Sequence, residues 1–152
     1  MQIPLSAYLT TSILAGLAGV AAMEFAMWLI TRTGWARGNM IVAIGSFLTR
    51  SMNNAFRVGL VIHVLLGIGF ALLYTFAMMK LGVTHLPKSV GLGLGLGFLQ
   101  GSVVSLTLVW VVSDQHPLTE FREASFAVGL THLAGHLAYG ATVGLIVGLA
   151  GL

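Results

Sequence analysis

The sequence has no cysteine and very little charge. Only 7% of its 152 residues are Asp, Glu, Lys or Arg, whereas about a quarter of the residues in a soluble domain are charged. Without cysteine the chain forms no disulfide, thiolate metal site or thiol nucleophile. It also contains neither a G-x-S-x-G nor an H-E-x-x-H motif, so it gives little support to hydrolytic catalysis.

What the chain has instead is apolar sequence. Hydrophobic residues make up 57% of it, and its mean hydropathy is +0.98. This composition indicates an integral membrane protein, with the lipid bilayer as its first partner. The net charge of +3 does not indicate nucleic-acid binding, because the chain has no basic stripe and no soluble module to carry one.

Four apolar runs approach the roughly 20 residues that a helix needs to cross a bilayer. They are Leu5 to Ile30, Val58 to Met79, Val90 to Val112 and Phe126 to Leu152. We therefore expect an all-α fold, an integral membrane four-transmembrane-helix bundle in which residues 1–152 form a single transmembrane domain.

The segment between the first two runs, Thr31 to Arg57, is long for a simple hairpin loop. Its middle, NMIVAIGSFLTR, is apolar but too short to cross a bilayer. It predicts a short interfacial or re-entrant helix, with Trp35 and Arg50 at the level of the lipid headgroups.

Positive charge is distributed unevenly between the two ends of the spans, and this predicts an orientation. One end has Arg32, Arg37, Arg50, Arg57 and Arg122, and the other has Lys80 and Lys88. The positive-inside rule then makes the first loop cytoplasmic and places both termini outside.

Small residues and histidines recur at four-residue steps, which places them on one face of a helix. The fourth run has this pattern at His132, His136, Gly140, Gly144 and Gly148. The third run has it at Gly93, Gly97, Gly101 and Ser105, and the second at Gly59, His63, Gly67 and Ala71. Such stripes mark close helix contacts in membranes, so we expect the histidines to face the bundle interior.

The depths of four ionisable residues also agree. Counting about 1.5 Å per residue from the span midpoints places Glu24 and His132 roughly 10 Å from the midplane, His63 about 7 Å and His136 about 4 Å, all towards the first loop. Glu24 is the only carboxylate inside a run, where a charge costs about 2.5–3.5 kcal/mol on insertion scales. These residues predict a buried polar layer in which Glu24 has a partner or carries a proton.

Three kinds of chemistry suit this layer. Haem b would take His63 and either His132 or His136 as axial ligands, with Arg50 and Arg57 at its propionates. A mononuclear site for Zn, Fe or Cu would use Glu24, His63, His132 and His136. A proton or quinone site would need only Glu24 and one histidine.

Each of these features also has a purely structural interpretation. Glu24 can simply bond His63 or a backbone group, and the two histidines of the fourth run can be packing residues. His85 and His116 fall in loops, and with Asp114 nearby we expect His116 to be solvated.

The segments VGLVIHVLLGIGFALLY and GHLAYGATVGLIVG resemble the DUF6789-like group of small bacterial four-span membrane proteins of unknown function. His63, Gly67, His136, Tyr139 and Gly140 match the group's histidine–glycine and HL-x-YG positions, and IVAIGSFL matches its loop segment. Members often carry a histidine in the third span, where this chain has Gln100. The resemblance implies a four-span protein of the bacterial inner membrane and no defined activity.

The sequence thus predicts a small membrane subunit or binding protein that holds a redox or metal cofactor in its polar layer. We expect it to work within a larger membrane complex or homo-oligomer and not as an enzyme on its own. Two alternatives remain open at this point: an accessory subunit that binds nothing, and a proton- or quinone-linked carrier or enzyme.

Overall fold

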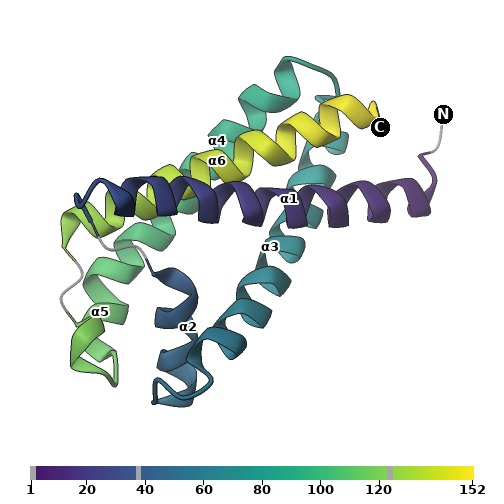
Figure 1. Ribbon diagram of the computed structural model, residues 1–152. Helices are drawn as coiled ribbons and strands as arrows, with labels where there is room; N and C mark the ends of the chain where they lie inside the picture. Colours follow the sequence, from purple (N-terminus) through teal and green to yellow (C-terminus); the bar gives the residue numbers. More distant parts are fainter. Residues whose placement is uncertain (1–2, 37–38, 123–124) are drawn as a thin grey trace.

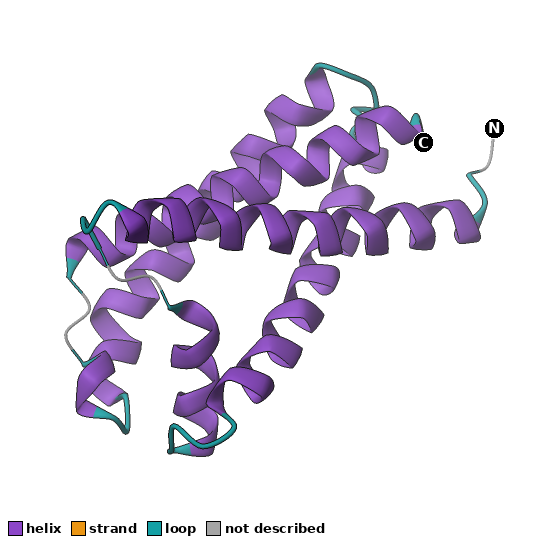
Figure 2. Cartoon of the chain, in the orientation of Figure 1, coloured by secondary structure: helices purple, strands orange, loops and turns teal. Residues whose placement is uncertain are grey.

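The computed structural model describes residues 3–36, 39–122 and 125–152. These residues form helices joined by loops, without a strand among them (Figure 2). The helices are α1 (Leu5–Arg32), α2 (Met40–Thr49), α3 (Ala55–Lys80), α4 (Lys88–Thr107), α5 (Ser113–Gln115) and α6 (Phe126–Ala150). A π-helical segment, η1 (Leu108–Val112), joins α4 to α5, and a 3-10 turn, η2 (Thr119–Phe121), precedes α6. Arg37, one of the residues behind the predicted orientation, lies outside the described residues.

In the part of the chain that the structure describes, four helices are long and apolar enough to cross a membrane: α1, α3, the continuous helix Lys88–Gln115 and α6. Large apolar side chains cover their outer faces, including Leu14, Phe25, Leu65, Leu99 and Leu149. Such surfaces suit contact with lipid hydrocarbon. The predicted membrane bundle is confirmed, and so is the short helix between the first two long helices.

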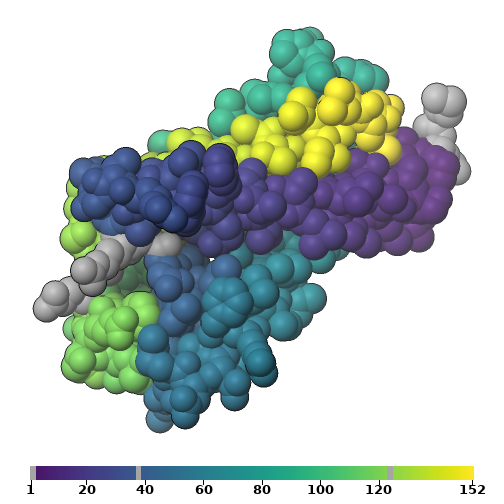
Figure 3. Space-filling model, in the orientation of Figure 1, coloured from purple at the N-terminus to yellow at the C-terminus, as the bar shows by residue number. Residues whose placement is uncertain are grey.

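The four long helices do not form a regular square bundle. α6 packs against α4 and α1, and α1 in turn crosses α3 (Figure 1). α3 touches α4 and α6 only slightly, and its first part packs along α2 instead. In the space-filling view α1 lies across the front face, with α6 above it and α3 below it (Figure 3).

The contact between α4 and α6 is made by backbone against backbone. A Cβ at Gly97 would overlap the carbonyl oxygen of His136, and a Cβ at Gly93 would overlap that of Gly140. The glycine stripes of the third and fourth runs therefore face each other within one chain, as small-residue stripes do in membrane bundles. Because this contact uses the stripes inside the chain, they do not by themselves indicate a partner subunit.

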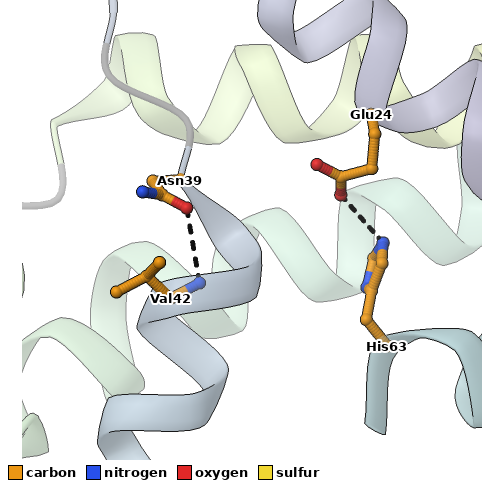
Figure 4. A network of polar contacts seen from close by, with 4 residues as sticks. All are labelled: Glu24, Asn39, Val42 and His63. Carbon is orange, nitrogen blue, oxygen red and sulfur yellow. Dashed lines mark hydrogen bonds and ion pairs between the residues drawn. The ribbon is translucent and has the colours of Figure 1, made fainter. Parts of the chain in front are cut away.

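The glycine stripe of α3 contacts two neighbouring helices, α2 and α1. At Gly59 the backbone of α3 meets Ile41 of α2, and at Gly67 it meets Val20 of α1. α2 begins at an N-cap in which the Asn39 side chain accepts a hydrogen bond of 3.3 Å from the backbone N–H of Val42 (Figure 4). The short helix thus packs along a long helix, with its start near the centre of the molecule.

The α4–α6 contact predicts a sharp difference between two glycines of one helix. Gly97→Val should lower the free energy of unfolding by about 1–3 kcal/mol, because overpacking a close contact costs that much. Gly95→Val is the matched control, since a Cβ there meets nothing within 4 Å. Unfolding in detergent, followed by circular dichroism, measures both. Equal stability of the two variants would contradict the packing described here.

Candidate functional site

Glu24 of α1 and His63 of α3 form a pair across two helices (Figure 4). Glu24 Oε1 lies 3.0 Å from His63 Nε2, an ion-pair distance, although the two atoms lack the alignment of a hydrogen bond. The His63 side chain is 9% exposed and that of Glu24 31%. The only carboxylate inside the four apolar runs therefore has an imidazole as its partner.

His132 lies on α6, one turn before His136, and is buried. Its Nδ1 lies 2.7 Å from the carbonyl oxygen of Val128. A carbonyl only accepts, so Nδ1 carries the proton and donates. In the neutral ring this leaves the Nε2 lone pair free, and Nε2 has no hydrogen-bond partner among the described residues.

His136 is the least satisfied polar side chain of the interior. It is 6% exposed, and neither of its ring nitrogens has a hydrogen-bond partner among the described residues. Its position follows from the close α4–α6 contact, because its Cβ lies against Gly101. His132 is close enough to Glu24, His63 and His136 for electrostatic interaction, and His136 is close enough to His63.

A cavity of about 110 Å³ lies between the helices beside these residues. Of the described residues, four polar side chains line it: His63, Gln100, His136 and Tyr139. The remaining lining residues are apolar or glycine: Val20, Met23, Met40, Ile44, Leu66, Gly67, Phe70 and Val104. Five helices thus enclose a small apolar cavity with a few polar groups, the usual composition of a small-molecule site.

Two tyrosines fix the polar wall of this cavity. The Tyr74 hydroxyl donates a 2.7 Å hydrogen bond to Gln100 Oε1, and the Tyr139 hydroxyl donates a 2.5 Å bond to the carbonyl oxygen of Gly67. The two rings meet edge to face at 5.8 Å. Gln100 was not among the predicted site residues, although it is the only side-chain amide inside the four apolar runs.

The structure does not bring together all the residues predicted for a metal. In the described ranges no three His, Asp or Glu side chains gather closely enough to hold a metal ion. Arg50, which caps α2, and Arg57, in the first turn of α3, are exposed and do not line the cavity. The predicted propionate partners are therefore separate from the histidines.

The cavity is also small for haem. Sites for drug-sized ligands measure about 300–1,000 Å³. A porphyrin is at least as large as a drug-sized ligand and needs a site of at least that volume. A volume of 110 Å³ is closer to the engineered cavity of about 150 Å³ that takes up benzene. The side chains offer imidazole ligands, but the space between them does not fit a porphyrin.

His116 differs from the prediction that it is solvated. It is 1% exposed, and its Nε2 lies 3.1 Å from the carbonyl oxygen of Ala43 in α2. Its Nδ1 accepts a 3.1 Å hydrogen bond from the backbone N–H of Leu118. Phe47 and Phe121 flank the ring. His116 thus fastens the segment after α5 to α2, and no local sequence pattern signals a contact across 73 residues.

No protein-family model, curated protein or solved structure matches the chain. The resemblance to the DUF6789-like group therefore stays a prediction, and the function has to be inferred from the geometry of the cavity.

A double-mutant cycle on Glu24→Gln and His63→Phe tests the pair in the polar layer. Residues in contact typically show coupling energies of about 0.5–3 kcal/mol, and we expect a value in this range for the free energy of unfolding. The same cycle with His85→Phe is the control, because His85 is exposed in the α3–α4 loop. Additive effects of Glu24→Gln and His63→Phe would show that the pair contributes nothing.

His116→Ala should loosen the segment between α5 and α6. Losing both ring hydrogen bonds costs about 1–3 kcal/mol, and hydrogen exchange should accelerate at the backbone amides of Leu118 and Phe121. His85→Ala, an exposed loop histidine, should leave that exchange unchanged. Unaltered exchange in His116→Ala would mean that the segment is held by other contacts.

Proposed function

We propose that the protein is a small integral membrane subunit or binding protein that holds a small redox-active, protonatable ligand in its central cavity. The observation that carries this proposal is His136, a nearly fully buried imidazole with two unpartnered nitrogens that lines the cavity. Buried polar groups are nearly always hydrogen-bonded, so an orphan of this kind calls for a partner. Ionisable residues inside membrane spans are expensive and mark functional sites.

The size and lining of the cavity limit the ligand. A volume of about 110 Å³ suits a single ring or a few small groups. Imidazole nitrogens from His63 and His136 and the amide of Gln100 lie in its wall. These groups can form hydrogen bonds with a ligand that has oxygen or nitrogen atoms on two sides of its ring.

The Glu24–His63 pair gives this site a means of moving a proton. His63 lines the cavity, whereas Glu24 is partly exposed on the outside of the helix pair. With 3.0 Å between Glu24 Oε1 and His63 Nε2, a rotation of either side chain that aligns these atoms would let a proton pass from Glu24 to His63 and from there to a ligand. The pair therefore connects the cavity with the outside of the bundle.

A metal ion is the second candidate, favoured by the same orphan nitrogens. Zn, Fe or Cu binds imidazole well, and His63, His132 and His136 with Glu24 supply the donor types. Since these side chains do not form a ready cluster, a metal would have to draw them together. An accessory subunit that binds nothing remains the alternative to both.

The proposal also includes the membrane, the orientation and the partners that the sequence predicts. In the bacterial inner membrane the arginine-rich first loop would face the cytoplasm, with both termini outside. Outward-facing glycines on α4, at Gly91 and Gly95, leave open space on that helix. They support packing against another membrane subunit or a second copy of the chain.

The test compares what the purified protein retains. Wild type in lipid nanodiscs should hold a small molecule or metal ion near one equivalent, detected by native mass spectrometry, absorption spectra and elemental analysis. His136→Phe, which keeps the ring shape and removes both nitrogens, should retain less than a tenth of it. His85→Phe should retain all of it, and circular dichroism confirms that both variants fold. If wild type holds nothing, or if His136→Phe retains as much as wild type, the proposal is wrong.

A further inference from the structure

A second, larger hollow lies between α2 and the helix that α4 forms with η1. Its volume is about 330 Å³, and we call it the α2–α4 groove. α2 lines it with Met40, Ala43, Ile44, Phe47 and Leu48, and the opposite wall consists of Val103, Val104, Thr107, Leu108 and Val112. Apart from the Thr107 hydroxyl, every one of these side chains is apolar.

The groove adjoins the central cavity. Met40, Ile44 and Val104 line both hollows, so these three side chains form the junction between them. Leu48 on one wall and Val103 on the other are 58% and 66% exposed, so both walls of the groove reach the surface of the molecule. Apolar walls thus run from the surface of the molecule to the three junction side chains, and the unpartnered imidazole of His136 lines the cavity on their far side.

The π-helical segment contributes to the shape of the groove. Leu108 and Val112, at the two ends of η1, are both wall residues. A π-helical turn adds a residue to the helix turn and is common at functional sites. In this chain it occurs where the wall of the groove is built.

We propose that the ligand is a lipid-soluble quinone, which reaches the site from the bilayer with its ring in the central cavity and its apolar chain in the α2–α4 groove. This inference rests on the proposed function and specifies the class of ligand. A quinone ring has two carbonyl oxygens on opposite sides, and these accept hydrogen bonds from imidazole and amide N–H groups. Its chain needs an apolar channel that opens to lipid.

The polar wall suits this ring. Because the Tyr74 hydroxyl donates to Gln100 Oε1, the amide of Gln100 keeps its NH₂ group as the donor for a ligand. His136 has both ring nitrogens available. A carbonyl oxygen near each of these side chains would satisfy the donors with one molecule.

The linings argue against a phospholipid or another strongly anionic ligand. Among the described residues that line the cavity or the groove, none is Lys or Arg. A buried phosphate without a cation would be costly, and the 110 Å³ inner cavity is suited to a ring. A neutral ring with hydrogen-bond acceptors needs no cation and is small enough for the inner cavity.

The experiment uses a benzoquinone with a decyl chain that ends in a photoreactive diazirine, added to the full-length protein in lipid nanodiscs. After illumination, mass spectrometry should find label on groove residues such as Phe47, Leu48, Val103 and Thr107. Excess decyl-benzoquinone without the diazirine should remove that label, and label on lipid-facing Leu65 and Leu99 should persist. Groove label that persists in excess decyl-benzoquinone, as the label on Leu65 and Leu99 does, would overturn the proposal, and so would the absence of groove label.

A substitution at the junction provides the second measurement. Ile44→Trp should weaken the binding of decyl-benzoquinone at least tenfold, because the indole fills the passage between groove and cavity. Leu65→Trp, on the lipid-facing side of α3, is the matched control and should bind as wild type does. Unchanged binding in a folded Ile44→Trp would overturn the route, and if that variant does not fold, the labelling pattern of wild type decides.

The two proposals fail in different ways. If wild type retains a small molecule or metal ion that depends on His136 but takes up no quinone, the ligand class is wrong and the proposed function stands. If neither a retained ligand nor quinone binding depends on His136, both are wrong.

Discussion

The structure depends on the direct contact between the backbones of α4 and α6. Gly93, Gly97 and Gly140 allow this contact, because a Cβ at any of them would overlap a carbonyl of the facing helix. The contact places His136 against Gly101, inside the molecule and away from lipid. From there its ring reaches the cavity that α1, α2 and α3 close from the other directions. The close contact between α4 and α6 therefore also determines where His136 lies in the candidate site.

Much of the fold follows from the sequence, because a chain in lipid has few choices. Runs of apolar residues must form helices that satisfy their own backbone groups, and four-residue glycine steps show which face makes close contact. These rules do not say which helix meets which face. The stripe of α3 meets α2 at Gly59 and α1 at Gly67, and nothing in the local pattern distinguishes these neighbours.

The site was only partly predictable for the same reason. Depth along each helix predicts that Glu24 and His63 share a layer, since both positions follow from helix rise. Rotation about the helix and contacts across the molecule do not follow. The bond from Tyr74 to Gln100 and the contact of His116 with Ala43 join segments that sequence proximity does not relate. Arg50 and Arg57 show the converse, because the sequence assigned them to the site although they do not line its cavity.

The central claim is that His136 faces a bound ligand within the bundle. A crystal structure of the wild-type protein, grown from a lipid mesophase without added ligand, tests it most directly. The account predicts density for a non-protein group within hydrogen-bond distance of a ring nitrogen of His136, between α3 and α6. A His136 ring that is bonded on both nitrogens to the protein's own groups, or turned to the lipid face, would contradict it.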